Sequence, residues 1–307
     1  MKTVFIIKAK QLDPLASAFR AKGWKVIRRK RNSHAPLGLD LYIAWNGTSY
    51  LNEAYVDKWK ESGGRIIYAE WGWLPQRAGI YLDSCGCAAK SSLMGMDLSK
   101  PIGRKEIRQT QQFINLYKTV CKKGQWFTWI DEPFIFIPLQ LEIDAQIVQF
   151  TPVKNMTEFL DIFKDWNQCP IYVKPHPAQA KLVGDVPRHS SYWIRTVSVG
   201  TDLGNLIDRS SLVITLNSCV GIEAIARGKK VMAFGESFYG REDLVEIGNF
   251  ENPIPYIKRS LNAGIPNHII DKRMRFLHKL YKRQLTPDIF NNPGIIDRIL
   301  NGVFERP

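Results

Sequence analysis

Short apolar runs alternate with longer amphipathic stretches along the first third of the chain. Runs of four to six apolar residues, rich in Ile, Val and Tyr, predict strands, and the stretches between them show helical spacing. The predicted strands span residues 3–9, 25–30, 39–45 and 65–70, and the predicted helices span residues 12–22 and 51–62. Strands separated by helices favour a parallel sheet with crossover connections, so residues 1–125 are predicted to form a Rossmann-like domain.

A second alternating series begins at residue 134, after a predicted helix at 103–123 and a segment, 124–133, with the Gly, Pro and aromatic residues of a domain junction. Its predicted strands span residues 134–140, 170–177, 192–197, 211–217 and 229–235, and its predicted helices 156–166, 202–209 and 219–227. We predict a second Rossmann-like domain over residues 126–270. Two such domains facing a cleft form the glycosyltransferase-B (GT-B) arrangement. We predict helices at 271–307. Whether they pack back on the first domain is left open by the sequence.

Length and composition fit an ordinary folded α/β chain. With 307 residues, 45% hydrophobic and 23% charged, the chain exceeds the roughly 250 residues at which single cores tend to split. The five cysteines show no paired spacing for zinc, so we expect no metal site and a reduced, intracellular protein. The apolar run before Lys8 is too short for a secretion signal, and no stretch approaches a membrane span. A cytoplasmic protein with at most peripheral membrane contact is expected.

The net charge of +14 comes from 43 Lys and Arg residues against 29 Asp and Glu residues. Many of the basic residues gather at 23–31, 103–108, 118–124 and 271–283. A basic surface of this kind concentrates anionic partners, such as a nucleotide donor, acidic lipid headgroups, a charged glycan or nucleic acid. Any single cluster could also be an ordinary solvated surface.

The segment after the predicted strand 211–217 has the features of a phosphate-binding turn. The strand ends at Asn217, Ser218 can cap the next helix, and Gly221 would allow a ligand close to the first helical turn. Exposed backbone N–H groups and the helix dipole favour a phosphate by about 0.3–1 kcal/mol for each such interaction. Glu223 lies in the first turns, where it could accept hydrogen bonds from a ribose. A plain capped helix is the alternative.

Lys174 and His176 alternate with two prolines at the end of the predicted strand 170–177. The prolines remove backbone donors and stiffen the turn, which fixes both side chains at the mouth of the strand. The lysine would supply charge to a phosphate, and the histidine could donate a proton or a hydrogen bond to a departing phosphate. A purely structural histidine is the alternative.

An acidic and amide-rich segment follows the predicted strand 134–140, and it carries Gln140, Glu142, Asp144 and Gln146. A carboxylate at a strand exit can act as a base toward an acceptor hydroxyl, or as a nucleophile at an anomeric carbon. Asp144 is therefore a candidate catalytic residue, with a helix-capping role as the alternative.

A further carboxylate, Glu70, ends the predicted strand 65–70 of the first domain and is followed by Trp71 and Trp73. We predict that Glu70 faces the same cleft as Asp144 from the opposite wall, as a second candidate catalytic carboxylate.

Four motifs, taken in order, resemble the capsule polysaccharide biosynthesis family, which includes bacterial transferases of 3-deoxy-manno-octulosonic acid (Kdo). They are AEWGWLPQ at 69–76, FIFIPLQLEIDAQ at 134–146, YVKPHPAQ at 172–179 and SLVITLNSCVGIEAIARGKKVMAFGESFYG at 211–240. The resemblance covers about residues 65–245, and the combination is far more specific than any single motif.

This resemblance implies a GT-B fold and a metal-independent reaction without a cofactor. It also implies a nucleotide-sugar donor, held mainly by the second domain. It assigns Asp144 as the catalytic carboxylate, Lys174 and His176 as contacts to the donor phosphate or a sugar carboxylate, and Ser218 and Glu223 as nucleotide contacts. Transfer by the Kdo enzymes retains the anomeric configuration, which would make Asp144 a nucleophile.

Two features depart from the family pattern. The N-terminal domain is compact, and Trp71 and Trp73 stand where a smaller or different residue is expected. Because the acceptor would contact that domain, the resemblance describes the donor machinery better than the acceptor.

Three functions are consistent with these features. The first is a glycosyltransferase that moves a sugar, for example Kdo from its CMP derivative, onto a glycan or glycolipid at the cytoplasmic membrane face. The second is a viral glycosyltransferase that acts on hydroxymethylated pyrimidines in DNA. The third is a catalytically idle module that binds a nucleotide sugar or nucleic acid.

Overall fold

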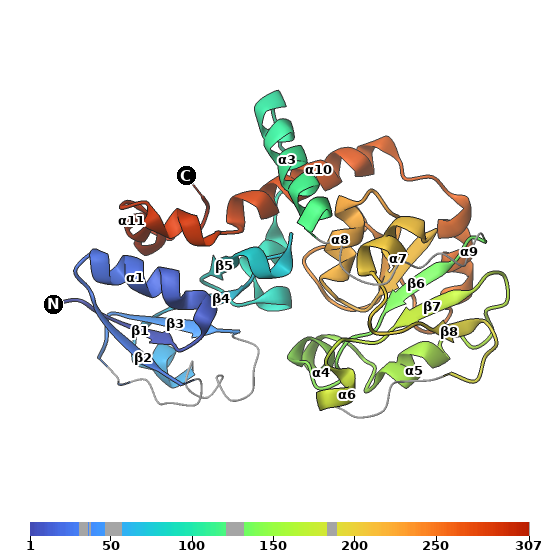
Figure 1. Cartoon of the computed structure of the whole chain (residues 1–307), viewed down its shortest axis with the longest axis horizontal. Helices are drawn as coiled ribbons and strands as arrows, with labels where there is room; N and C mark the ends of the chain where they lie inside the picture. Colours follow the sequence, from blue (N-terminus) through green and yellow to red (C-terminus); the bar gives the residue numbers. More distant parts are fainter. Residues whose placement is uncertain (31–35, 37, 47–56, 121–131, 183–188, 307) are drawn as a thin grey trace. The chain divides into compact units, whose positions relative to one another are not determined.

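A computed structural model describes residues 1–30, 36, 38–46, 57–120, 132–182 and 189–306 (Figure 1). The predicted helix at 51–62 lies outside the described residues except for 57–62, of which 57–61 are helical, and most of the predicted junction at 124–133 also lies outside them. The chain divides into two compact units, Met1–Met96 together with Lys279–Pro307, and Asp97–His278.

The first unit contains a five-stranded sheet in the order β2-β1-β3-β4-β5. The four predicted strands are present as β1 (Thr3–Ile7), β2 (Lys25–Arg29), β3 (Leu41–Trp45) and β4 (Arg65–Trp71). They run parallel, whereas β5 (Ile80–Asp83), which the sequence analysis missed, is antiparallel to β4. The prediction relied on the alternation of strands and helices. It missed the four-residue β5 because β4 and β5 are joined as a hairpin, without a crossover helix.

Helix α1 (Asp13–Ala21) shows how the local sequence shapes this unit. Pro14 lies in the first turn, where its missing N–H costs no intrahelical bond, and the buried face carries Leu15 and Phe19. After the helix, Gly23 takes a φ of +84°, a left-handed conformation that glycine adopts without strain. The chain then turns into β2, and the amide of Trp24 donates to the carbonyl of Phe19 at 3.1 Å.

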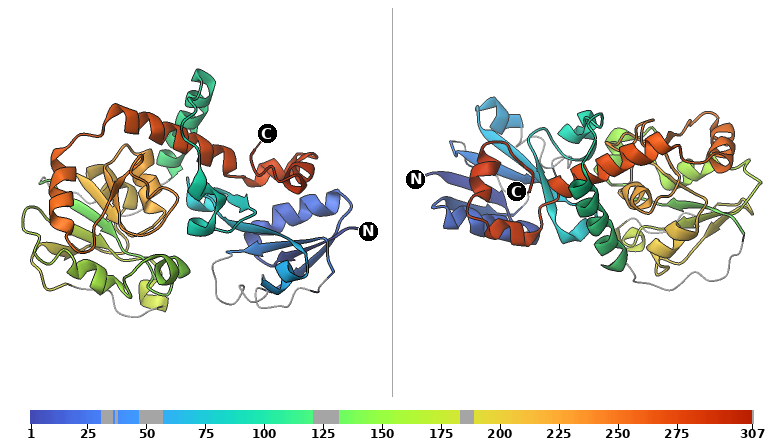
Figure 2. Two further views of the ribbon diagram at one scale, coloured as in Figure 1. Left: turned by 180° about the vertical axis from the view of Figure 1, so that it is seen from behind. Right: turned by 90° about the horizontal axis from the view of Figure 1, so that it is seen from above.

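The C-terminal segment returns to the first unit, which was the arrangement left open for residues 271–307. After α10 (Asn267–Arg283), Leu285 pairs with Ile80 of β5 through two backbone hydrogen bonds of 2.7 and 2.9 Å. The 3₁₀ helix η5 (Pro287–Asn291) and helix α11 (Ile295–Leu300) then contact α1, as Figures 1 and 2 show. Smaller 3₁₀ helices in this unit are η1 (Lys10–Leu12), η2 (Gln76–Ala78), η3 (Ala88–Lys90) and η4 (Ser92–Gly95).

The second unit contains a six-stranded parallel sheet in the order β11-β10-β9-β6-β7-β8. Its strands are β6 (Ile135–Pro138), β7 (Ile171–Lys174), β8 (Ile194–Thr196), β9 (Leu212–Thr215), β10 (Val231–Ala233) and β11 (Glu246–Ile247). Its helices are α3 (Arg104–Val120), α4 (Ala145–Phe150), α5 (Met156–Asp161), α6 (Gln179–Leu182), α7 (Leu203–Arg209), α8 (Val220–Ala226) and α9 (Pro253–Asn262). The five predicted strands are all present, and only the two-residue β11 was missed.

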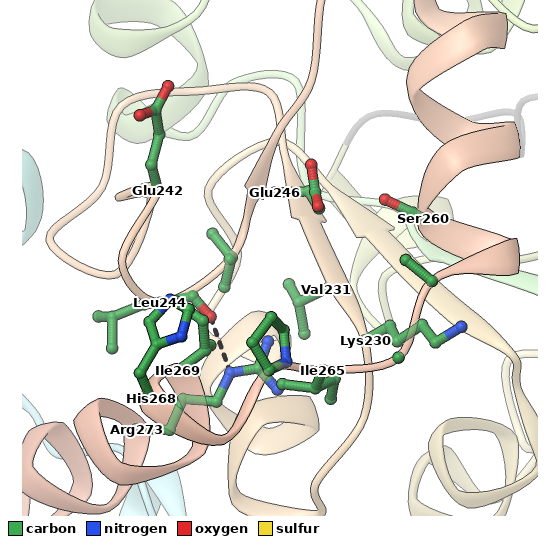
Figure 3. A pocket seen from close by; sticks show the side chains of 14 residues that line it. Lys230, Val231, Glu242, Leu244, Glu246, Ser260, Ile265, His268, Ile269 and Arg273 are labelled. Carbon is green, nitrogen blue, oxygen red and sulfur yellow. Dashed lines mark hydrogen bonds between the residues drawn. The ribbon is translucent and has the colours of Figure 1, made fainter.

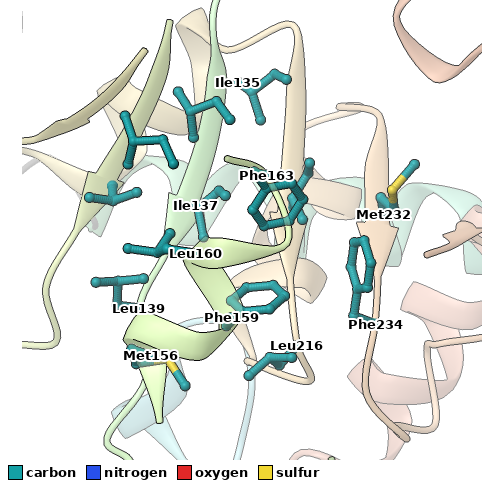
Figure 4. Close-up of a cluster of buried hydrophobic side chains, with 14 of the residues drawn as sticks. Ile135, Ile137, Leu139, Met156, Phe159, Leu160, Phe163, Leu216, Met232 and Phe234 are labelled. Carbon is teal, nitrogen blue, oxygen red and sulfur yellow. The ribbon is translucent and has the colours of Figure 1, made fainter. Parts of the chain in front are cut away.

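Apolar side chains from the strands and helices of this unit form one buried cluster (Figure 4). Phe159 and Phe163 of the α5 region meet Phe234, which follows β10, with ring centroids 5.6 and 5.8 Å apart. Strands β6, β7 and β9 are buried along their whole length. Burial of both faces is typical of parallel strands covered by crossover helices and explains their continuous apolar sequence.

The boundary between the units lies at Asp97, whereas the sequence analysis placed it at residue 125. The reason is that α3 is tied to α10 within the second unit. Thr110 of α3 is hydrogen-bonded to Nδ1 of His278 at 3.0 Å. Arg275 donates to the carbonyls of Leu98 and Ser99 at 2.9 Å each. These contacts join segments far apart in the sequence, so apolar periodicity could not place α3.

A buried carboxylate holds the C-terminal segment of the first unit to β5. Asp83, which is fully buried, accepts hydrogen bonds from Arg283 at 2.9 Å and from the backbone and side chain of Ser92 at 2.6–3.2 Å. The hydroxyl of Ser91 donates to it at 2.8 Å. Removing one partner of such a pair leaves the other charge buried without compensation.

We expect Asp83→Ala to lower the free energy of unfolding by about 3–5 kcal/mol, because it leaves the Arg283 guanidinium without its carboxylate partner. Asp13→Ala is the matched control, since Asp13 also pairs with an arginine, Arg28, at 2.7 Å, but its side chain is 59% exposed. Because the Asp13 carboxylate is largely in water, its pair with Arg28 should contribute less than about 1 kcal/mol. Urea unfolding measures both variants, and equal losses would contradict the anchoring role of Asp83.

Candidate active site

The residues predicted for donor binding follow the parallel strands of the second sheet. Strands β6, β7, β9 and β10 end at Pro138, Lys174, Thr215 and Ala233. Because these strands are parallel, their carboxyl ends lie at one edge of the sheet, which is where open α/β sheets bind ligands. The loops after β6, β7 and β9 carry Asp144, His176 and Ser218.

An amide network joins the loops after β6 and β9. Nε2 of Gln140 donates to Oδ1 of Asn217 at 2.9 Å, and the amide of Asn217 donates to Oε1 of Gln140 at 3.3 Å. Nδ2 of Asn217 donates to the carbonyl of Gln146 at 2.9 Å. Asn217 was predicted to contact the nucleotide-sugar donor. It is only 9% exposed, and its hydrogen bonds hold the two loops together.

Asp144 lies at the start of α4 on the same network. Its Oδ1 accepts a hydrogen bond from the amide of Gln146 at 2.9 Å, so the helix-capping alternative is observed. The residue is exposed, and its Oδ2 accepts no hydrogen bond from the described part of the chain. Capping therefore orients the carboxylate and leaves one oxygen available to a ligand.

His176 is oriented by the backbone after β7. Its Nδ1 accepts a hydrogen bond from the amide of Ala178 at 3.1 Å. When Nδ1 accepts, the proton of the neutral imidazole is on Nε2, so this nitrogen is a donor in either protonation state. His176 is partly exposed, which suits donation to a ligand phosphate.

Lys174 is buried at 8% exposure, and its ammonium donates to the carbonyl of Val199 in the segment after β8. Burial lowers its pKa, and the nearby carboxylate of Asp202 partly offsets this effect. Lys174 thus ends β7 as predicted, but its ammonium is bound to the loop between β8 and α7.

The first turn of α8 is covered by Tyr239, which the sequence analysis did not single out. Its hydroxyl donates to the carbonyl of Ser218 at 2.6 Å, and burial raises its pKa so that the phenol stays protonated. A Cβ added at Gly221 would lie 2.5 Å from Cε2 of Tyr239. Gly221 is therefore required for packing of the tyrosine ring, whereas the sequence analysis reserved this space for a ligand.

Ser218 was predicted as the N-cap of α8, but the observed N-cap is the next residue, Cys219. Helix α8 begins at Val220 with Cys219 at the N-cap position. The hydroxyl of Ser218 still accepts a hydrogen bond from the amide of Val220 at 3.2 Å, and its own amide donates to the hydroxyl of Thr215 at 3.2 Å. Ser218 thus links the end of β9 to the start of the helix.

Glu223 is engaged by α3 rather than placed toward the strand ends. Its Oε2 accepts a hydrogen bond from the hydroxyl of Tyr117, which also accepts one from Nε of Arg227 at 3.2 Å. Burial raises the pKa of Glu223, and the Tyr117 hydrogen bond and the charge of Arg227 oppose that rise. The predicted ribose contact would require Glu223 to leave this network.

Glu70 belongs to the first unit, whereas the other candidate residues belong to the second. It is in β4, and its Oε1 accepts a hydrogen bond from the amide of Trp71 at 2.8 Å. Its predicted placement opposite Asp144, and the cleft between the two domains, stay predictions.

A pocket of about 250 Å³ lies in the first unit, and Glu70 is not among the residues that line it. It is lined by Trp71 at the end of β4, by Lys10 after β1 and by Arg77. The indole of Trp71 is positioned by Trp45, whose ring meets it edge-on at 5.4 Å. An aromatic face with two cations is typical of sites that bind an anionic group with an apolar surface. The sequence signal was the placement of Lys10 and Trp71 just after or at the end of strands, but the sequence analysis did not connect them.

Two kinds of feature are absent from the described ranges. No three His, Cys, Asp or Glu side chains in those ranges are grouped to hold a metal ion. No helix in them combines the length and apolar character needed to cross a bilayer. The expectations of no metal, no cofactor and peripheral membrane contact stay predictions.

Comparison with solved structures defines the class of fold. Two structures of Thermosulfurimonas dismutans KpsC are similar to this chain, each with a TM-score of 0.63. The beta Kdo 2,4 transferase is 15% identical and the match covers 89% of both chains. The beta Kdo 2,7 transferase is 17% identical and the match covers 98% of this chain and 99% of that one. The chain is thus an α/β protein with two Rossmann-like units and a GT-B-like fold.

Sequence comparison confirms the family resemblance. Residues 121–251 match the family described as capsule polysaccharide biosynthesis protein. This match contains three of the four motifs and every candidate site residue except Glu70.

Two curated proteins are similar to the chain. Protein FixF of Sinorhizobium fredii is 27% identical over 271 residues, which are 85% of this chain and 64% of FixF. The capsule polysaccharide modification protein LipA of Neisseria meningitidis serogroup B is 28% identical over 114 residues, which are 36% of this chain and 16% of LipA. The chain therefore spans less than two thirds of either relative.

We expect Gly221→Ala to destabilise the protein by about 1–3 kcal/mol, because the added methyl would overlap the ring of Tyr239. The loss should shrink in a Tyr239→Leu background, where the ring is absent. Gly200→Ala is the control, since the nearest atom to its Cβ would be 3.7 Å away. Thermal unfolding measures all variants, and an undiminished loss in the Tyr239→Leu background would contradict this packing explanation.

Proposed function

We propose that the chain is a glycosyltransferase that moves a sugar from a nucleotide-sugar donor to an anionic glycan or glycolipid. The GT-B-like fold and the match to the capsule family support this class. The observation that carries the proposal is the edge of the second sheet, where the exposed Asp144 is fixed by the same residue, Gln146, that holds Asn217 next to Ser218.

The proposed chemistry follows from charge. Departure of the nucleotide creates negative charge on its phosphate, and groups placed beforehand to meet that charge lower the barrier. His176 would donate through Nε2, and Lys174 would add positive potential from its buried position. The open oxygen of Asp144 would stabilise the positive anomeric carbon, or form a covalent intermediate if transfer retains configuration.

The first unit would bind the acceptor. Trp71 would stack on a sugar ring, while Lys10 and Arg77 would attract acidic groups of the glycan or lipid. The net charge of +14 supports an anionic acceptor. The matches described above give no support to modified DNA as acceptor, and Kdo from its CMP derivative is the donor that the family resemblance favours.

The first experiment tests class and donor together. Calorimetry with CMP-, UDP-, GDP- and dTDP-linked sugars identifies the donor, and label transfer is then measured to lipid-linked capsule glycan and to hydroxymethylated DNA. Transfer to the glycan supports the proposal. Transfer to DNA alone favours the viral alternative, and donor binding without any transfer favours the idle module.

We expect Asp144→Ala to abolish transfer with little change in donor affinity, and Asp144→Asn to do the same while keeping the helix cap. His176→Ala should slow turnover by about 10²–10³, the range for one lost charge-stabilising donor. Asn155→Ala is the matched control, because Asn155 caps α5 through the amide of Glu158 at 2.8 Å and lies outside the proposed machinery. Unchanged turnover of Asp144→Ala would remove Asp144 from the mechanism.

We expect Trp71→Ala to raise the KM for the acceptor by about tenfold, equivalent to about 1.4 kcal/mol, because the stacking surface is lost. Trp71→Phe, which keeps an aromatic face, should recover most of the affinity. Donor affinity should not change in either variant. Initial rates at varied acceptor concentration measure the effect, and a change in donor affinity alone would place Trp71 in donor binding.

A further inference from the structure

A second pocket of the Asp97–His278 unit lies away from the candidate active site (Figure 3). It has a volume of about 230 Å³ and is lined by residues from Lys230 to Arg273. Lys230 and Val231 stand at the amino end of β10, and Glu246 begins β11. The pocket is therefore at the opposite end of these strands from the loops that carry the candidate catalytic residues.

Arg273 on α10 lines this pocket with a charge that no carboxylate balances. It is only 6% exposed, and it donates through Nε to the carbonyl of Leu244 at 2.7 Å and through Nη1 to that of Lys229 at 2.8 Å. Its Nη2 makes no hydrogen bond, and no carboxylate lies within 4.0 Å of the guanidinium, among the residues that the structure describes. A buried, unpaired charge of this kind is costly unless a partner is supplied.

Burial lowers the pKa of Arg273 to about 10, which leaves the guanidinium protonated at neutral pH. Protonation matters because the charge persists under the conditions in which the enzyme would work. The two backbone carbonyls orient the guanidinium but bring no full negative charge.

Ser260 on α9 supplies a second unpartnered polar group at the same pocket. It is 3% exposed, and its buried Oγ has no hydrogen-bond partner within the described ranges. This Oγ is too buried for a ligand atom to touch, and Figure 3 shows Ser260 at the top of the pocket beside Glu246, away from Arg273, so it does not share a ligand with the guanidinium.

The start of α10 adds donors and positive potential. Pro266, His268 and Ile269 line the pocket, and α10 is 17 residues long. The N–H of Ile269 already donates to the carbonyl of Pro266 at 3.0 Å, so the donors that this helix start can offer are the N–H groups of Asn267 and His268. The helix dipole is positive at this end.

The carboxylates of the pocket are placed away from Arg273. Glu246 pairs with Arg259 at 2.8 Å, and in Figure 3 the carboxylates of Glu242 and Glu246 lie at the top while Arg273 lies at the bottom. The rest of the lining is apolar and includes Val231 and Ile265.

We propose that this pocket binds a small organic anion, a phosphate monoester or a carboxylate with an apolar part, through Arg273 and the start of α10. The site is separate from the candidate active site, so it would serve an effector or a non-reacting part of the glycan. Phosphate and carboxylate offer the oxygen geometry that the guanidinium fork accepts.

The test uses the full chain and isothermal calorimetry at low salt. Phenyl phosphate and benzoate are the anionic probes, and benzyl alcohol is the neutral probe of similar shape. We expect saturable binding of at least one anion, which identifies the preferred head group, and none of benzyl alcohol. Arg273→Gln should weaken anion binding more than about tenfold, whereas Ser260→Ala should leave it unchanged.

Arg275→Gln is the matched control. Arg275 lies on the same helix and also bonds two backbone carbonyls, those of Leu98 and Ser99, but it does not line the pocket. It should leave anion binding unchanged.

The outcome of this test is independent of the transferase assay, because its readout is binding at a different site. If Arg273→Gln fails to fold, Arg273→Lys decides, because it keeps one positive charge but loses the guanidinium fork that binds two oxygens of a phosphate or carboxylate. Absence of anion binding to the native chain at millimolar concentrations would overturn the proposal. Equal affinity in the native chain and in Arg273→Lys would also overturn it, as would an equal loss in Arg275→Gln.

Discussion

The parallel alignment of the six strands in the second sheet is the constraint on which the candidate site depends. It brings the ends of β6, β7 and β9 to one edge, although 77 residues separate Gln140 from Asn217. Burial of both faces of these strands fixes their register, because a slipped strand would place polar loop residues in the core. The amide pair of Gln140 and Asn217 then locks the two loops in register.

Within this frame the polar residues divide into two groups by their partners. Oδ1 of Asp144 accepts a hydrogen bond from the backbone amide of Gln146, and Nδ1 of His176 accepts one from the backbone amide of Ala178; each contact orients the side chain that accepts it. Asn217 and Glu223 have their side chains engaged by other parts of the protein. The first group suits contact with reacting atoms, and the second suits support of the loops and helices that present them.

Two arginines on α10, the buried Arg273 and the partly buried Arg283, show how burial and charge compensation differ along one helix. Arg283 is balanced by Asp83, and the pair joins the C-terminal segment to β5. Arg273, ten residues earlier on the same helix, has only carbonyl partners and faces a pocket. The desolvation cost is similar in kind for both, so the missing carboxylate at Arg273 points to a ligand rather than to a structural role alone.

The sequence by itself determined every described strand except β5 and β11, most helices and the family resemblance, because apolar periodicity and the order of the motifs are local properties. It also placed Asp144 and His176 at strand exits. Only the tertiary structure decided that α3 belongs with the second unit, that Tyr239 fills the space above Gly221 and that Glu223 is held by Tyr117. Each of these depends on contacts between residues far apart in the chain, for which a single sequence carries no periodic signal.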